Sequence, residues 1–357
     1  MSQYRGPLHE MTQTTPTCLW TDTAGYEELQ DSIGFGAVGA TCNPVIALGV
    51  LKKEMAYWKP RIAELAAQLP TATEDQLGWK LVEAMSIRAA GLLHPIFERN
   101  KGRNGRLSIQ TDPRFFRDPK LLAEQAVYFS KLAPNMIVKI PVTSAGIPAI
   151  EEATYRGVSI NATVSFALPQ CVAVAEAVER GLSRREKEGL PVDTMGPVCT
   201  IMVGRLDDWM KVVAEKDGIT VDPGHMEWAG VAVFKKTYKL FKQRGYRIRL
   251  LSAAYRNHMH WSEFIGGDVV VSPPYPFEVK FNKSDISAKP RMDNPVDERI
   301  LASLEKIPDF RRSNTDGGMT VADFDTFGPT RRTLRQFLTA NTDLQALVRD
   351  TLIPNPD

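Results

Sequence analysis

Cysteine is scarce in this chain, and a net charge of either sign is nearly absent. The 357 residues include four cysteines, Cys18, Cys42, Cys171 and Cys199, and no two of them form a CxxC pair. A disulfide framework or a structural zinc site is therefore not expected, and a reducing cytoplasm is the favoured location. The net charge of +2 predicts no basic surface for nucleic acid.

Long apolar runs and a glycine-rich nucleotide fingerprint are also missing. No run approaches the 18 apolar residues that a membrane-spanning helix requires, and residues 1–16 lack the basic-then-apolar pattern of a signal peptide. No Gly-x-Gly-x-x-Gly follows the first strand candidate, which argues against a dinucleotide-binding sheet. We expect a soluble intracellular protein that contacts neither membrane nor nucleic acid. A homo-oligomer is left open.

Short apolar runs alternate with longer segments of helical period. Most of these runs are followed by a helical segment, which predicts a parallel sheet covered by helices. Their Val and Ile content suits strands that are buried on both faces. Eight such strands close a (β/α)8 TIM barrel, and an open doubly wound sheet is the alternative. The strand candidates are residues 18–23, 37–43, 106–111, 136–141, 158–166, 197–203, 246–254 and 268–274.

The positions of proline, threonine and glycine predict several helix boundaries. Pro44 suits the first turn of a long helix, and Pro60 is expected to break that helix. Thr73 begins a cap-like Thr-x-x-Gln sequence. From about residue 290 to residue 357 the chain is predicted to form two or three further helices, with a glycine-rich break at "NTDGGMT". We expect residues 1–357 to form a single barrel domain with this helical C-terminal extension.

Polar or charged residues stand at the end of nearly every predicted strand. A single Asp or Asn there is normally a turn or cap residue, and a Thr normally reflects strand propensity. In a barrel, however, the carboxyl ends of all strands meet on one face, where chemistry is located. The whole set therefore predicts a site. Its members are Asp22, Asn43, Gln110, Asp112, Lys139, Asn161, Thr163, Thr200, Arg205, Arg256 and Ser272.

Lys139 is the residue of this set with the most specific chemistry. It is the only charge inside the apolar run "MIVKIP". A structural, ion-paired lysine is one reading of it. The other reading is chemical: apolar surroundings lower the pKa of a lysine, and the uncharged amine is a nucleophile that forms a Schiff base with a ketone. Arg205 and Arg256 suit a phosphate group, and we expect them to help keep Lys139 neutral. No metal site is expected, because no carboxylate-rich ligand spacing surrounds His258 and His260.

Several stretches in chain order resemble one known family. "GATCNPVIAL", "LSIQTD", "VKIPVTSAGIPAIEEATYRGVSINATVSF" and "VGRLDDW" resemble the transaldolases, which are class I Schiff-base aldolases, and "SAAYRN" resembles their phosphate-binding segment. The resemblance extends from about residue 17 to about residue 275. It implies a barrel that needs no cofactor. It also implies a transferase that moves a dihydroxyacetone unit between sugar phosphates, in the pentose-phosphate part of carbohydrate metabolism.

The resemblance also implies catalytic roles, residue by residue. Lys139 corresponds to the Schiff-base lysine, and Asp22 to the acid/base of carbon–carbon cleavage. Thr163 corresponds to a residue that helps to hold the catalytic water.

Further matches concern substrate binding. Asn43 corresponds to a ligand of substrate hydroxyls, and Asn161 to a residue beside the imine. Arg205 and Arg256 correspond to the phosphate ligands. Thr200 stands where the family usually has Ser and keeps the hydroxyl.

Two departures from the family pattern leave the reaction outcome open. Gln110 stands in place of a catalytic Glu, and the related fructose-6-phosphate aldolases also have Gln there. Those aldolases pair it with a Tyr at the position of Met202, where transaldolases usually have Phe. We therefore expect a transaldolase-like transferase. A direct aldolase that releases dihydroxyacetone and a weakly active sugar-phosphate binder are the alternatives.

Overall fold

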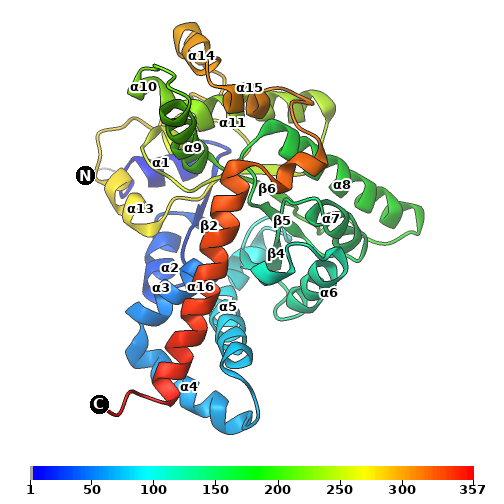
Figure 1. Cartoon of the computed structure of the whole chain (residues 1–357), viewed down its shortest axis with the longest axis vertical. Helices are drawn as coiled ribbons and strands as arrows, with labels where there is room; N and C mark the ends of the chain where they lie inside the picture. The colour runs from blue at the N-terminus through cyan, green and yellow to red at the C-terminus, as the bar shows by residue number, and fades with distance from the viewer. Residues whose placement is uncertain (1–2) are drawn as a thin grey trace.

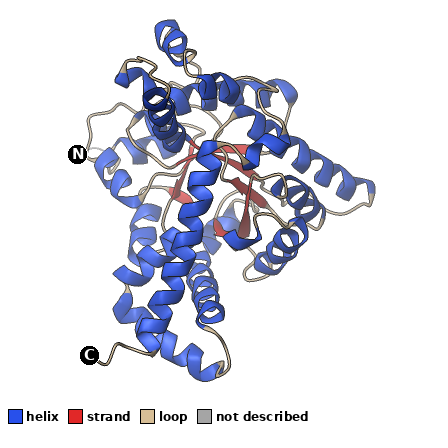
Figure 2. Cartoon of the chain, in the orientation of Figure 1, coloured by secondary structure: helices blue, strands red, loops and turns tan. Residues whose placement is uncertain are grey.

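Eight parallel strands form a closed barrel in the computed structural model, which describes residues 3–357. Each strand pairs with the next along the chain, and the last pairs with the first, Cys18 lying opposite Val270. The predicted (β/α)8 barrel is confirmed, and the open sheet is excluded. Figure 2 shows the strands enclosed by helices. The strands are β1 (Cys18–Thr21), β2 (Ala37–Cys42), β3 (Arg106–Gln110), β4 (Met136–Pro141), β5 (Ile160–Thr163), β6 (Val198–Met202), β7 (Arg249–Ala253) and β8 (Val270–Val271).

Helices follow the strands around the barrel and continue beyond the last one (Figure 1). Those up to β8 are α1 (Pro7–Thr14), α2 (Tyr26–Gly34), α3 (Pro44–Lys53), α4 (Met55–Gln68), α5 (Glu74–Arg99), η1 (Pro113–Phe115), α6 (Pro119–Ser130), α7 (Gly146–Tyr155), α8 (Leu168–Lys187), α9 (Val203–Lys216), α10 (Pro223–Met226), α11 (Ala229–Arg244) and α12 (Met259–Ser262). After β8 come α13 (Tyr275–Asn282), α14 (Glu298–Leu304), α15 (Pro308–Asn314), η2 (Val321–Asp325) and α16 (Gly328–Leu352). Within residues 3–357, no helix has the length and hydropathy needed to cross a bilayer.

Two of the predicted helix starts are confirmed, and one predicted break is wrong. Pro44 begins α3, and Thr73 forms a capping box with Gln76 at the start of α5. Pro60 does not end a helix, because α4 continues through it. The break lies at Glu54, whose carboxylate accepts hydrogen bonds from the Tyr26 N–H at 2.8 Å and from Arg88 at 3.0 Å. These contacts with other helices fix the bend there.

The interior of the barrel is filled by large apolar side chains below the level of Lys139. Side chains alternate between the two faces of a strand, so residues two apart share the inner face. Trp20 needs room there: a Cβ at Gly39 on the neighbouring strand would lie 2.4 Å from its ring. This packing places Asp22, two residues after Trp20, at the open end above the core. The interior cluster consists of Trp20, Ile137, Val198, Leu251 and Val270.

The C-terminal extension places its last helix against the open end of the barrel. The predicted helices beyond residue 290 are confirmed as α14, α15, η2 and α16. Helix α16 packs on α3, α4, α5 and α9, and in Figure 1 it runs across the front of the molecule toward the C-terminus. Near its start, Thr333 accepts a hydrogen bond from Arg205 at 3.1 Å. The first turns of α16 therefore lie beside the strand ends. The division of the chain into domains stays a prediction.

Candidate active site

The carboxyl ends of the strands surround a cavity of about 170 Å³. Seven of the residues proposed from the sequence line it: Asp22, Asn43, Lys139, Thr163, Thr200, Arg205 and Arg256. They come from β4, β5, β6 and the segments that follow β1, β2, β6 and β7. The closed sheet thus brings together side chains that are far apart in the sequence. Met202 also lines this cavity.

Lys139 lies at the inner wall of the cavity with its side chain almost completely buried. Its exposed fraction is 5%. Burial lowers the pKa of Lys139 below the ordinary lysine value, and the negative charge of the nearby Asp22 carboxylate opposes this shift. Arg205 and Arg256 are not among the groups that shift it, so the expectation that they keep the amine neutral is wrong. Desolvation is the cause, and it favours the uncharged nucleophile.

Gln110 and Asn161 flank Lys139 on the neighbouring strands. Gln110 pairs in register with Lys139, which in turn pairs with Asn161. Asn161 is held on both sides, because it donates to Ser108 Oγ at 3.0 Å and accepts from Thr200 Oγ1 at 2.7 Å. Neither flanking residue is part of the cavity lining. The side-chain oxygen of Gln110 is buried and has no hydrogen-bond partner within residues 3–357, so it is available to a water or a substrate.

Asp22 and Asn43 form the wall of the cavity on the side of β1 and β2. Asp22 is partly buried, and its Oδ1 accepts a short hydrogen bond from Thr41 Oγ1. Its backbone N–H donates to the carbonyl of Pro273 at 3.0 Å, which ties β1 to the segment after β8. Asn43 Oδ1 caps α3 by accepting from the Ile46 N–H at 3.0 Å. The side-chain NH₂ group of Asn43 remains to donate to a substrate hydroxyl.

A cationic compartment adjoins the lysine cavity. A second cavity, of about 330 Å³, shares Arg205 and Arg256 with the first and adds Arg332 from α16 and Asp208 from α9. Burial and the charge of Arg256 lower the pKa of Arg205 to about 10, so Arg205 is still charged at neutral pH. Three arginines and one aspartate leave this compartment with two net positive charges, which matches a phosphate dianion.

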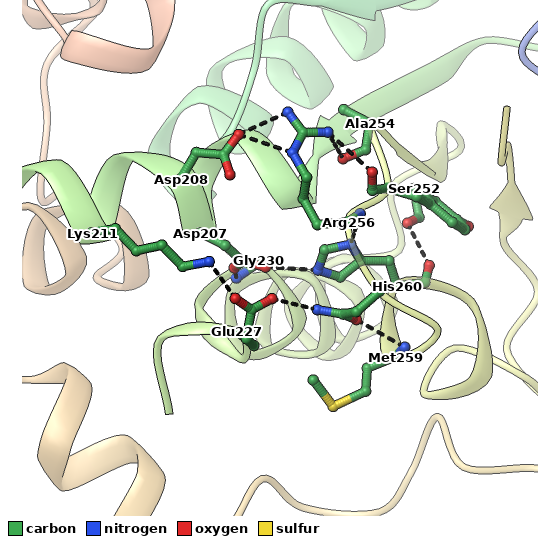
Figure 3. Close-up of polar contacts among 12 residues, drawn as sticks. Asp207, Asp208, Lys211, Glu227, Gly230, Ser252, Ala254, Arg256, Met259 and His260 are labelled. Carbon is green, nitrogen blue, oxygen red and sulfur yellow. Dashed lines mark hydrogen bonds and ion pairs between the residues drawn. The ribbon is translucent and has the colours of Figure 1, made fainter. Parts of the chain in front are cut away.

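The two predicted anion ligands are held differently. Arg256 donates to Asp208 Oδ2 from Nε at 3.0 Å and from Nη2 at 2.7 Å, and its Nη1 donates to the carbonyls of Ala254 and Tyr255 (Figure 3). Arg205 donates from Nη1 to Thr333, and its buried Nε has no partner within residues 3–357. Since a guanidinium has five N–H bonds, Arg205 keeps more of them free for a ligand than Arg256 does.

Residues of α16 are the part of the site that sequence reasoning missed. Phe337 lines the lysine cavity, and Arg332 lines the cationic compartment. The cluster of arginines in "GPTRRTLRQF" was a signal, but nothing in the sequence placed that helix beside the strand ends.

Two other strand-end candidates do not line the cavity. Asp112 caps η1 and pairs with Arg114 at 2.5 Å, and Ser272 is buried. A larger cavity of about 740 Å³ lies against α11 and contains none of the strand-end residues. Within residues 3–357, no group of three or more His, Cys, Asp or Glu side chains is placed to hold a metal, and all four cysteines are free.

Comparison with known proteins agrees with this geometry. A family model described as Transaldolase/Fructose-6-phosphate aldolase matches residues 19–313. The chain belongs to this family. The match continues past the expected limit near residue 275 and reaches into α15.

Individual members of the transaldolase/fructose-6-phosphate aldolase family match over shorter stretches. A protein named Transaldolase 2 from Streptomyces avermitilis is 34% identical over 173 residues, which are 48% of this chain and 45% of that protein. A Transaldolase from Thermobifida fusca is 35% identical over 48% of this chain and 46% of its own length. A Transaldolase from Kocuria rhizophila is 30% identical over 58% of this chain and 56% of its own length. The matched stretch thus spans about half the length of each relative.

Proposed function

We propose that this chain is a transaldolase-type transferase that moves a dihydroxyacetone unit between sugar phosphates through an imine on Lys139. The observation that carries the proposal is the position of Lys139. A buried amine with a lowered pKa opens into a cavity whose far side is cationic. The membership of the family supports the same reaction. We place the reaction in the cytoplasm, with the substrates of the pentose-phosphate part of carbohydrate metabolism.

The proposed cycle begins when the Lys139 amine attacks the ketone carbon of the donor and water leaves, giving the imine. Asp22 then accepts the proton of the substrate hydroxyl next to the bond that breaks. The carbon–carbon bond cleaves, its electrons pass into the imine, and an aldose phosphate departs while the three-carbon enamine stays on Lys139. The enamine carbon attacks the aldehyde of the acceptor, and Asp22 returns its proton to the new hydroxyl. Water finally hydrolyses the imine and releases the new ketose phosphate.

The other residues of the site have binding roles in this proposal. Asn43 would hold substrate hydroxyls, and Asn161, on the strand next to Lys139, would lie beside the imine. Thr163 would orient the water that forms and cleaves the imine. Thr200 supports Asn161 through their hydrogen bond of 2.7 Å. The phosphate would occupy the compartment of Arg205, Arg256 and Arg332. The net charge of +2 in this compartment would balance the two negative charges of the phosphate.

Met202 favours transfer over direct cleavage, and beside it Gln110, which the direct aldolases also carry, is proposed to slow hydrolysis of the three-carbon imine. An amide can hold a water, but it cannot take and return the water's proton as a carboxylate does. Hydrolysis of the three-carbon imine on Lys139 is therefore slow, and the three-carbon unit stays bound to the enzyme until an acceptor enters. Met202 lines the cavity without a hydroxyl, whereas the fructose-6-phosphate aldolases use a Tyr at this position.

The test is the dependence of product release on the acceptor. The protein is mixed with a ketose phosphate alone, and the released aldose phosphate and dihydroxyacetone are measured separately. We expect about one equivalent of aldose phosphate, almost no dihydroxyacetone, and continuous turnover once an aldose phosphate acceptor is added. Continuous release of dihydroxyacetone without an acceptor would make the protein a direct aldolase. Binding of the donor without release of any product would make it a sugar-phosphate binder.

A further inference from the structure

A fully buried carboxylate–imidazole pair lies behind Arg256 and has no part in the reaction described so far. His260 Nε2 lies 2.7 Å from Asp207 Oδ2, and both side chains have an exposed fraction of 0%. The other oxygen of Asp207 accepts a hydrogen bond from the Gly230 N–H at 2.8 Å. Figure 3 shows the imidazole between Asp207 and the backbone of Arg256. Asp207 belongs to the "VGRLDDW" stretch that also supplies Arg205 and Asp208.

The hydrogen bonds around His260 assign its tautomer. The backbone N–H of Arg256 donates to His260 Nδ1 at 3.0 Å, so Nδ1 carries no proton. Nε2 must then carry the proton and donate it to Asp207 Oδ2. Because Asp207 accepts at both oxygens, it matches only the Nε2–H form of the ring. The carboxylate therefore selects the tautomer that can hold the Arg256 backbone.

The loop that carries Arg256 is fixed on several sides. Its first residue, Ala254, has a left-handed φ of 62°, which turns its carbonyl toward the Arg256 guanidinium at 3.2 Å. The loop also approaches α9 closely, because a Cβ at Gly204 would lie 2.3 Å from the Ala254 oxygen and 2.7 Å from Arg256 Cγ. Farther along, Asn257 donates to Glu227 Oε2 at 2.8 Å. Small changes in the backbone at Arg256 would thus move the guanidinium relative to the anion compartment.

We propose that Asp207 and His260 are positioning residues for anion recognition: they hold the backbone N–H of Arg256 and so fix where its guanidinium meets the substrate's phosphate. The proposal rests on the proposed function only in naming the phosphate. It requires no titration and no contact between the pair and the substrate. It also gives a role to four residues of the stretch, since Gly204 permits the close approach, Arg205 faces the cavity, Asp207 orients His260, and Asp208 holds Arg256.

Two substitutions of His260 separate its two hydrogen bonds. In His260→Asn, the side-chain oxygen falls near the position of Nδ1 and can still accept from the Arg256 N–H. In His260→Gln, the amide nitrogen falls near Nε2 and keeps the bond to Asp207, but the acceptor for Arg256 is lost. We expect His260→Gln to raise KM for a ketose phosphate about tenfold, the loss typical of one hydrogen bond near a charged group. The KM of His260→Asn for the same substrate should stay within about twofold of the parent value, because the hydrogen bond from the Arg256 N–H persists.

Asp207→Asn tests the selection of the tautomer. The single oxygen of the new amide is expected to stay with the Gly230 N–H, so its NH₂ group faces His260 and requires an unprotonated Nε2. The proton then moves to Nδ1. Nδ1 can no longer accept the hydrogen bond from the Arg256 N–H, because two donors would face each other. Nitrogen-15 NMR of the histidines should show the Nε2–H form in the parent and the Nδ1–H form in Asp207→Asn. KM for the ketose phosphate should rise about tenfold while kcat changes little.

Controls separate positioning from general damage and from failure of the proposed function. His258→Asn alters the other histidine of the loop, whose Nδ1 lies 3.1 Å from Ser262 Oγ, and should leave KM unchanged. Borohydride trapping with unphosphorylated dihydroxyacetone should be equal in all variants, because it does not use the anion compartment. Calorimetric binding of inorganic phosphate reports on the anion site even if the parent shows no turnover. Thermal melts identify any variant that does not fold. If one His260 variant fails to fold, the phosphate affinity of the other, compared with the parent, tests the proposal.

Three outcomes would overturn the proposal. The first is equal phosphate affinity in His260→Asn and His260→Gln. The second is an Nδ1–H ring in the parent protein. The third is unchanged phosphate binding in Asp207→Asn although the tautomer has moved. In contrast, a parent without transferase activity whose variants still follow the expected order of phosphate affinity would contradict only the proposed function.

Discussion

Replacing Arg205 should weaken phosphate binding more than replacing Arg256, because the two side chains differ in their free donors. Four of the five N–H bonds of Arg256 are used by Asp208 and by the carbonyls of Ala254 and Tyr255. Arg205 gives one bond to Thr333 and keeps a buried Nε–H without a partner within residues 3–357. A phosphate would therefore receive one N–H from Arg256, and a fork of two from Arg205 Nε and Nη2.

The size of the effect follows from that difference. A hydrogen bond to a charged group contributes about 1.5–3 kcal/mol, and about 1.4 kcal/mol corresponds to a factor of ten. We expect Arg256→Met to raise KM for a ketose phosphate about tenfold, and Arg205→Met about 100-fold. Met keeps a flexible apolar stem, so the packing of residue 205 near Phe337, whose ring centroid lies 5.9 Å from the guanidinium, is largely retained.

The assay compares kcat and KM for a phosphorylated donor and for its unphosphorylated analogue. Arg205→Lys serves as the matched control: it keeps the charge but loses the fork, and KM should lie between those of the parent and Arg205→Met. The analogue should respond little to any of the three changes. A larger loss for Arg256→Met than for Arg205→Met, or equal losses with both donors, would refute the assignment of free donors.

Four further predictions concern catalysis and the loop. Asp22→Ala should still form a trappable imine but lose about 10²–10⁴-fold in turnover, and ordinary turnover would reduce Asp22 to a turn residue. Gln110→Glu should speed the decay of the imine measured without acceptor; unchanged decay with weaker donor binding would make Gln110 a substrate contact. Because burial lowers the pKa of Lys139, its amine fraction grows as pH rises through that lowered value, and imine formation should level off below pH 10.5; a rate still rising beyond that pH contradicts the shift. Gly204→Ala should raise KM for the phosphorylated donor and lower Tm, because the new Cβ would lie 2.3 Å from the Ala254 oxygen. Unchanged KM and Tm would show that the loop moves away from the methyl group at no cost.

The barrel and its polar rim were predictable because both depend on local patterns. Apolar runs of strand length mark the strands, and side-chain alternation then places Lys139 two residues above Ile137 on the inner face. Closure of the sheet brings every strand end to one side, so the residues that follow the strands could be assigned to one site without knowledge of their distances.

Features that depend on long-range contacts were not predictable in this way. The sequence suggested a helix break at Pro60, but the carboxylate of Glu54 bonds to Tyr26 and Arg88 on two other helices, and the bend lies there. Arg332 belongs to a helix whose own pattern says nothing of what it packs against. The lowered pKa of Lys139 was expected from its apolar run, and burial is indeed its largest cause. The extent of that burial depends on the three-dimensional packing around the amine, which the run alone does not give.

The measurement that tests the central claim most directly is borohydride reduction of the protein with a ketose phosphate donor, followed by mass spectrometry of the intact chain and its peptides. We predict that the mass of one reduced three-carbon unit appears on the peptide that contains Lys139, and that Lys139→Met neither traps donor nor turns over. Trapping at another lysine, or normal turnover in Lys139→Met, would contradict the account.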